Sequence, residues 1–78
     1  MQAIKILYFA SLRELIGAPE LSLEVSEPMD AASVWHVANP TVALPESSLV
    51  AINQAYAGLD SMVAPGDEVA FFPPVTGG

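Results

Sequence analysis

The sequence predicts an α+β domain in which a β-sheet packs against one main helix. Three observations support this class. The 78 residues, 53% of them hydrophobic, suffice for one domain with one modest core. Apolar segments with the pattern of buried strands lie near both ends of the chain, at residues 3–10 and 67–72. Between them, one segment that begins at Asp30 has the start and stop signals of a helix.

The first strand is expected at residues 3–10. Apolar side chains fall on both of its faces, with Ile4, Ile6 and Tyr8 on one and Leu7 and Phe9 on the other. This pattern is typical of a central strand that is covered on both sides, or covered on one side by a partner protein.

A short helix is expected next, over residues 11–16. Ser11 and Glu14 have the spacing of a capping box, in which each side chain satisfies a backbone N–H at the helix start. Gly17 can adopt the left-handed conformation that ends a helix, and Pro19 prevents its continuation.

The middle of the chain contains a strand and the main helix. Residues 21–25 alternate between apolar and polar, which indicates a strand with one buried face. Asp30 is expected to cap a helix that runs to Ala38 and ends at Asn39-Pro40. We expect three of its side chains to face the core and Trp35 to lie at the core edge; the three are Val34, Val37 and Ala38. Signals over residues 41–48 are weak.

Further strands are expected at residues 49–54, 56–59 and 67–72. Pro65-Gly66 before the last of them is a type II turn signal. The last strand carries Val69 and Phe71 on one face and Ala70 and Phe72 on the other. Because the first and last strands are both rich in apolar residues, both are expected to be central, and the element order favours an antiparallel sheet.

Composition excludes several classes of function. Nine carboxylates against two basic residues give a formal net charge of −7. This charge disfavours the binding of nucleic acid. It suits a basic protein partner, or it serves solubility alone. No apolar run approaches the roughly 20 residues of a membrane span, and the N-terminus lacks the pattern of a signal peptide. Cysteine is absent, so the chain has no disulfide or thiolate metal site, which agrees with the cytoplasmic location that we expect.

Few residues of the domain itself are candidates for chemistry. His36 is expected to be a surface residue of the helix rather than a base. Asp67 and Glu68 are adjacent on a strand, so their side chains diverge and do not form a metal or acid–base pair. Three larger residues, Met29, Met62 and Trp35, are expected to serve packing. We therefore predict no metal site and no cofactor bound by the chain.

The C-terminal segment is a better candidate. Pro73-Pro74 ends strand pairing and favours an extended conformation. Gly77-Gly78 lacks side chains and can enter a narrow channel, where it presents a carboxylate that reacts only after activation. The alternative is an ordinary frayed terminus. We divide the chain into a domain over residues 1–72 and a flexible tail over residues 73–78.

Both ends of the sequence resemble the molybdopterin synthase small subunits, which are the sulfur carriers of the MoaD family. The resemblance is carried by Phe-Phe-Pro-Pro-Val-Thr-Gly-Gly at residues 71–78, preceded by Pro-Gly-Asp-Glu-Val-Ala at residues 65–70. It also includes Ile-Lys-Ile-Leu-Tyr-Phe-Ala at residues 4–10, Leu-Arg-Glu-Leu at residues 12–15, and Val-Ala-Ile-Asn-Gln at residues 50–54. The resemblance implies a ubiquitin-like β-grasp fold with a mixed sheet, one main helix, one short helix and a flexible C-terminal tail.

The resemblance also implies a mechanism. An adenylating enzyme related to the ubiquitin-activating class would use ATP to form a glycyl adenylate at Gly78, and a sulfur donor would convert it to a thiocarboxylate (1-thioglycine). The tail would insert into the large synthase subunit through Pro73, Pro74, Val75, Thr76 and Gly77. Two such transfers would turn cyclic pyranopterin monophosphate into molybdopterin, in a heterotetramer of two small and two large subunits.

The tail alone is not expected to hold such a complex. Ordering its six residues costs roughly 6–12 kcal/mol at about 1–2 kcal/mol per residue, although the prolines reduce this cost. We therefore expect part of the sheet to bind the partner, with Phe9 and Phe72 as candidate interface residues. The alternative is that both belong to the core.

Three other functions remain open from sequence alone. A thiamine-pathway sulfur carrier would share the Gly-Gly end without the preceding Phe-Phe-Pro-Pro-Val-Thr run. A ubiquitin-like modifier would be joined to lysines of other proteins. A plain binding module would keep its function after deletion of Gly77-Gly78, whereas every carrier function would lose it.

Overall fold

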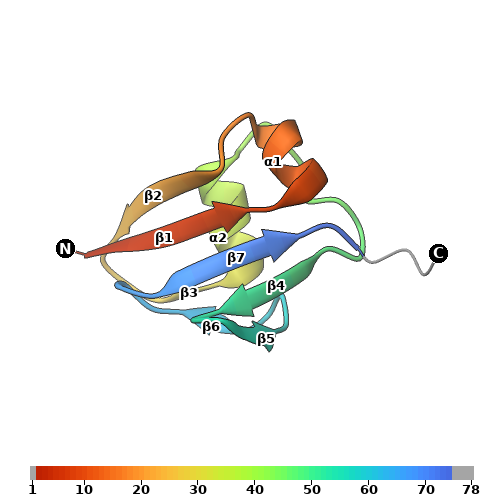
Figure 1. Ribbon diagram of the computed structural model, residues 1–78. Helices are drawn as coiled ribbons and strands as arrows, with labels where there is room; N and C mark the ends of the chain where they lie inside the picture. The colour runs from red at the N-terminus through yellow and green to blue at the C-terminus, as the bar shows by residue number, and fades with distance from the viewer. Residues whose placement is uncertain (1, 75–78) are drawn as a thin grey trace.

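The computed structural model describes residues 2–74 and contains two helices and seven strands (Figure 1). The elements in chain order are β1 (Gln2–Tyr8), α1 (Ala10–Ile16), β2 (Glu20–Val25), β3 (Met29–Asp30), α2 (Ala31–Ala38), β4 (Leu49–Ile52), β5 (Ala55–Ala57), β6 (Met62–Val63) and β7 (Glu68–Phe72).

Five strands form one sheet in the order β2-β1-β7-β4-β5, with α2 across one of its faces (Figure 1). The two strands expected to be central, β1 and β7, are both interior, which confirms that prediction. They pair in parallel, with Ile6 opposite Val69, whereas the other pairs of this sheet are antiparallel. The antiparallel sheet predicted from element order is therefore wrong, and the mixed sheet is confirmed. Parallel pairing is possible because nearly the whole chain lies between β1 and β7 and serves as the crossover.

The core lies between this sheet and α2, and Trp35 is at its centre. The Trp35 ring is fully buried and meets Tyr8 and Phe71 edge-on, at centroid distances of 5.6 and 5.1 Å. Its indole N–H donates to the carbonyl of Val42 at 2.8 Å. The prediction that Trp35 lies at the core edge is therefore wrong. Val37, expected inside, is 55% exposed, because the apolar row of α2 follows residues 31, 34, 35 and 38 instead.

Helix α1 begins one residue before the predicted start, and its predicted capping box is absent. Phe9 occupies the N-cap with extended backbone angles and makes no side-chain cap hydrogen bond. The cause is the sheet, because the Phe9 N–H donates to the carbonyl of Phe71 at 3.2 Å and holds residue 9 in extended conformation. At the other end, Gly17 adopts the left-handed conformation with a φ of 87°, as predicted.

Other local predictions are confirmed. Asp30 caps α2 by accepting a hydrogen bond of 2.8 Å from the Ser33 N–H. The turn before β7 has Gly66 at a φ of 95° and is closed by a 3.0 Å hydrogen bond from the Asp67 N–H to the Ala64 carbonyl.

Two features of the sheets were not predicted. The strand expected over residues 49–54 ends at Ile52, because Asn53 and Gln54 form a tight turn with left-handed φ values of 51° and 69°. The strands β3 and β6 form a separate two-stranded sheet that the sequence pattern did not indicate. They are two residues long each, too short to carry a periodic signal.

Candidate functional site

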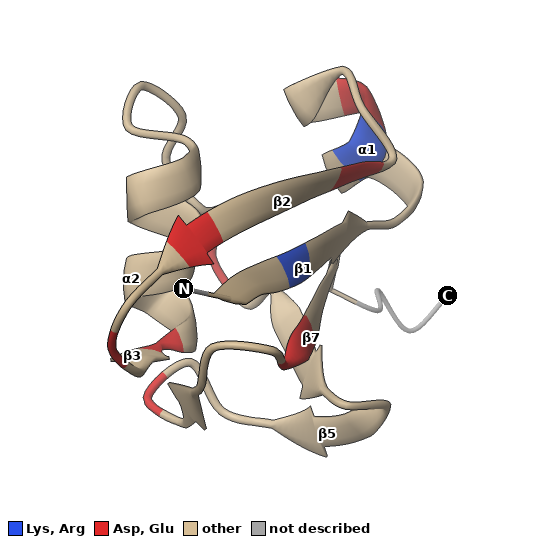
Figure 2. Ribbon diagram, turned by 90° about the vertical axis from the view of Figure 1, so that its left-hand side faces the viewer, with Lys and Arg blue, Asp and Glu red and all other residues tan. Residues whose placement is uncertain are grey.

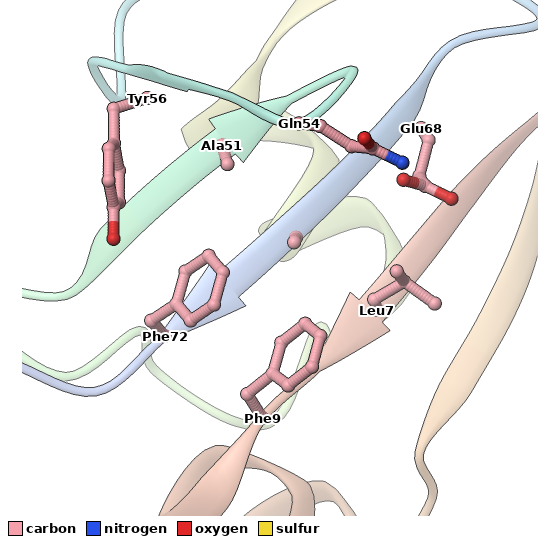
Figure 3. Close-up of a pocket in the computed structure, with 8 residues that line it drawn as sticks. Leu7, Phe9, Ala51, Gln54, Tyr56, Glu68 and Phe72 are labelled. Atoms are coloured by element: carbon pink, nitrogen blue, oxygen red, sulfur yellow. The ribbon is translucent and has the colours of Figure 1, made fainter.

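The candidate site is the sheet face opposite α2, which we call the open face. On it the Phe9 and Phe72 rings stack at a centroid distance of 4.8 Å and an interplanar angle of 6° (Figure 3). Phe9 is 41% exposed and Phe72 is half-buried, so neither is a core residue. Tyr56 is 78% exposed, and the centroid of its ring lies 6.2 Å from that of Phe72. The structure therefore excludes the alternative that Phe9 and Phe72 belong to the core.

A shallow groove of about 350 Å³ runs along the open face. Its shape follows from one cross-strand row, in which Ala70 pairs with Leu7 on one side and Ala51 on the other, and Ala51 pairs with Tyr56. Two alanines in the middle of the row, flanked by larger side chains, leave the surface hollow. The lining residues are Leu7, Phe9, Ala51, Gln54, Tyr56, Glu68, Ala70 and Phe72.

The two ends of the groove differ in chemistry. Strand β7 presents Glu68, Ala70 and Phe72 to it in alternation, so that a carboxylate lies at one end and an aromatic ring at the other (Figure 3). Gln54 lies at the carboxylate end and Phe9 at the aromatic end.

Asn53 fixes the backbone at the carboxylate end. The Glu68 N–H donates to Asn53 Oδ1 at 3.0 Å, and the Asn53 N–H donates to the Glu68 carbonyl at 2.7 Å. This reciprocal pair joins the β4–β5 turn to the start of β7. As a result, Gln54 and Glu68 project from a common, hydrogen-bonded base.

The aromatic end is adjacent to the start of the tail. Pro73 directly follows Phe72 and is half-buried, and Pro74 is exposed. The other predicted site residues, Val75, Thr76, Gly77 and Gly78, lie outside the described residues. The same strand, β7, thus carries three of the eight lining residues and leads into the segment predicted to be chemically active.

The remaining candidates of the domain have structural roles or are solvated. His36 is exposed on α2, as expected. Asp67 accepts a 2.9 Å hydrogen bond from the Ala64 N–H inside the turn. Met62, expected to pack, is 59% exposed. Over residues 2–74, no three His, Cys, Asp or Glu side chains are grouped so that they could hold a metal ion.

Two pKa shifts have local causes away from the open face. Burial raises the pKa of Tyr8, and the hydrogen bond from Asn39 Nδ2 to its hydroxyl opposes that rise. Hydrogen bonds from Ser33 hold the pKa of Asp30 below its usual value. Both groups belong to the packing and capping of α2.

Charge is distributed unevenly over the surface. Acidic residues lie on α1, on β2, around β3 and at the start of β7, and the two basic residues lie on β1 and α1 (Figure 2).

Neither helix of the described chain has the length and apolarity to cross a membrane.

Comparisons with known proteins agree with this architecture. The model of the ThiS family matches residues 6–78. Proteins named "Molybdopterin synthase sulfur carrier subunit" from Haemophilus influenzae and Escherichia coli are 45% and 41% identical to the chain, each over 96% of the chain and 99% of the relative. The crystal structure of small archaeal modifier protein 1 from Haloferax volcanii superimposes with a TM-score of 0.77 at 25% identity, over 96% of this chain and 100% of that one. The ubiquitin-like β-grasp fold is thereby confirmed.

Proposed function

The chain belongs to the ThiS family, and we propose that it is the sulfur carrier subunit of a molybdopterin synthase. In this role it is the small subunit of a sulfurtransferase complex and has no activity alone. The observation that carries the proposal is the match, over nearly the full length of both chains, to relatives that bear this name at 41–45% identity. The open face supports it, because a carrier needs a surface on which its partners dock.

The reactive group in this proposal is the carboxylate of Gly78. A carboxylate resists attack by sulfur nucleophiles because its negative charge repels them and it has no good leaving group. ATP-dependent adenylation by an activating enzyme forms a mixed anhydride with release of pyrophosphate. A sulfur donor then displaces AMP and leaves a thiocarboxylate. That sulfur is passed to cyclic pyranopterin monophosphate, and two transfers complete the dithiolene of molybdopterin.

The tail and the open face would act together on the large subunit. We propose that Pro73, Pro74, Val75, Thr76 and Gly77 form the thin arm that brings Gly78 to the substrate. Phe9 and Phe72 would dock on the large subunit at the base of this arm. The substrate carries a phosphate, so its pocket is expected to be basic, which suits a chain with a net charge of −7. The expected assembly contains two small and two large subunits, in the cytoplasm.

The decisive experiment is intact-mass spectrometry of the chain after incubation with ATP, magnesium, a sulfide source and the adenylating enzyme of the same organism. We expect a mass gain equal to the replacement of one oxygen by sulfur, located at Gly78 by fragmentation. A variant that lacks Gly77-Gly78 is the matched control and should stay unmodified. An unchanged mass of the full chain, with an enzyme that adenylates a known carrier, would refute the carrier function.

Protein modification is a second candidate, favoured by the structural similarity to small archaeal modifier protein 1. In that case Gly78 would form an amide bond with a lysine of a target protein and lose its activating group. The two functions differ in their products. A modifier would appear in cell extracts as covalent adducts of larger mass that resist thiols and denaturants, and a sulfur carrier would appear only as the free chain.

A further inference from the structure

We propose that Gln54 and Glu68 form a recognition site for an arginine side chain at one end of the open-face groove. The arginine would come from the large synthase subunit, on a segment whose apolar side chain packs at the Phe9–Phe72 end. This inference rests on the proposed function, and it assigns a chemistry to the end of the groove farther from the tail.

The lining of the groove supports a cationic ligand. Glu68 is the one charged side chain among the eight described residues that line it, and it is half-buried. Figure 3 shows the Gln54 amide and the Glu68 carboxylate side by side at the same end. The amide nitrogen of Gln54, a hydrogen-bond donor, is turned toward the carboxylate in this view, so the acceptors at this end are the two Glu68 oxygens. The planar fork of a guanidinium can donate to both oxygens of one carboxylate at once. An ammonium is a point donor and fits this pair of acceptors less well.

The backbone at this end is built at a cost in stability. Gln54 has a φ of 69°, in the left-handed region that favours glycine at this turn position. Such conformations concentrate at functional sites when the surrounding structure holds them in place. Here the two hydrogen bonds between Asn53 and Glu68 hold the turn. The strained conformation of Gln54 does not improve core packing, because the side chain is exposed. It does place the side-chain amide beside the Glu68 carboxylate.

Lys5 is the one basic residue near this end. It pairs with Glu68 in the β1–β7 register, so both side chains leave the same face of the sheet. The Lys5 side chain is exposed and does not line the groove. Within residues 2–74 no ion pair joins Lys5 to Glu68, and an exposed, solvated lysine competes only weakly for a neighbouring carboxylate. A partner guanidinium that enters the groove excludes water and makes a stronger contact with the same carboxylate.

Net charge also favours the large subunit over a second copy of this chain as the occupant of the groove. Two copies each carry a net charge of −7, so the stacking of one open face on another would bring two acidic molecules into contact. A basic partner turns this repulsion into attraction. The groove is therefore better suited to the large subunit than to self-association.

Isothermal titration calorimetry of the full-length chain with the large synthase subunit of the same organism tests the proposal. Glu68→Gln removes the charge and keeps the shape of the side chain. Glu27→Gln is the matched control, since it removes the same charge from an exposed residue in the turn before β3. Lys5→Gln is the third variant. Superimposable circular dichroism spectra and melting curves establish that each variant is folded before it is titrated.

We expect Glu68→Gln to weaken binding about 10- to 100-fold, which corresponds to the loss of one charge-assisted hydrogen bond. The affinity of Glu68→Gln should also depend less on salt than that of the native chain. Glu27→Gln should bind within about twofold of the native chain, as expected for a solvated charge outside the interface. Lys5→Gln should bind as well as the native chain or more tightly, because it removes a competing positive charge from the neighbourhood of the carboxylate.

Four results would overturn the proposal, and each can be told apart from the expected outcome. If the native chain binds and Glu68→Gln matches Glu27→Gln, the arginine site is wrong and the proposed function stands. If Lys5→Gln weakens binding as much as Glu68→Gln, the carboxylate serves Lys5 and not the partner. If the native chain does not bind the large subunit, or sedimentation shows a dimer that Glu68→Gln strengthens, the proposed partner is wrong and the arginine site falls with it.

Discussion

Two adjacent phenylalanines of β7 allow the division of the sheet into a core face and an open face to be tested. Phe71 is fully buried and packs against Trp35 and Tyr8 at centroid distances of 5.1 and 6.4 Å. Phe72 points to the opposite face and stacks on Phe9. Phe71→Ala and Phe72→Ala therefore remove the same atoms from neighbouring positions in two different environments.

The expected magnitudes differ severalfold. Truncation of a buried phenylalanine costs about 3–5 kcal/mol, because it loses transfer free energy and leaves a cavity. The free energy of unfolding of a domain of this size is about 4–12 kcal/mol, at roughly 0.05–0.15 kcal/mol per residue. Phe71→Ala should therefore remove a large part of the total. Phe72 is half-buried, so its truncation should cost about 1–2 kcal/mol in burial and ring stacking.

Thermal unfolding followed by circular dichroism measures this difference. At about 4–8 °C per kcal/mol for a domain of this length, Phe71→Ala should melt at least 12 °C below the native chain, and Phe72→Ala roughly 4–16 °C below it. Titration with the large subunit, below both melting temperatures, gives the second readout. Phe72→Ala should lose more binding than its stability explains, and Phe71→Ala should bind in proportion to its folded fraction.

The reasoning would be refuted by equal melting temperatures of the two variants, or by a lower one for Phe72→Ala. Either result would mean that Phe72 belongs to the core and that the open face is closed in solution. Native-like binding by Phe72→Ala would leave the fold intact and remove this ring from the interface.

Three further predictions concern single residues. As pH falls from the ordinary pKa of an aspartate through the depressed pKa of Asp30, the native chain should lose stability relative to Asp30→Asn, because the ionised carboxylate gains more from the hydrogen bonds of Ser33 than the protonated one. Parallel pH profiles of the two melting temperatures would contradict this. Trp35→Phe should lower the free energy of unfolding by about 1–3 kcal/mol in urea titrations, since it leaves the carbonyl of Val42 without its donor, and a loss below about 0.5 kcal/mol would show that water replaces the donor. Gln54→Gly should raise the melting temperature by a few degrees, because it relieves about 1 kcal/mol of left-handed backbone strain. The same substitution should weaken binding to the large subunit. A lower melting temperature would show that the turn is not strained.

Features that depend on a few neighbouring residues could be predicted from the sequence. The cap at Asp30 and the left-handed glycines at positions 17 and 66 follow from local backbone chemistry, and the structure confirms them. The strand character of residues 3–10 and 67–72 follows from apolar content and is also confirmed, with ends shifted by one or two residues. In each case the determining interaction lies within about one turn or one strand.

Features that depend on distant partners could not be predicted in the same way. Ser11 and Glu14 have the spacing of a capping box, but the strand bond between Phe9 and Phe71 starts the helix one residue earlier. The inward rotation of Trp35 depends on Tyr8 and Phe71, which lie far away in sequence. The prolines and glycines of the tail indicate an extended arm that ends in a carboxylate, but its sulfur chemistry is implied only by the resemblance of residues 65–78 to a known family.

The carboxylate end of the groove was missed for the same reason. From the sequence, Glu68 is assigned no site, because adjacent acidic residues on a strand diverge and do not form a pair. That argument is correct for Asp67, which stays in the turn, but it also sends Glu68 to the open face. Gln54 had no signal of its own, since its place beside Glu68 depends on the β4–β7 pairing and on the Asn53 bonds.

On the proposed function, the position of the groove on β7 solves a problem of affinity. A complex with a Kd near 1 μM has only about 8 kcal/mol of net binding free energy, and ordering the tail would consume roughly 6–12 kcal/mol. The open face must therefore supply most of the favourable binding free energy, and it can do so before the tail is ordered. Because Phe72 is followed directly by Pro73, docking of the ring fixes the point from which the arm extends. The two prolines then limit the conformations left to be searched, so that the surface that supplies affinity also sets the reach of Gly78.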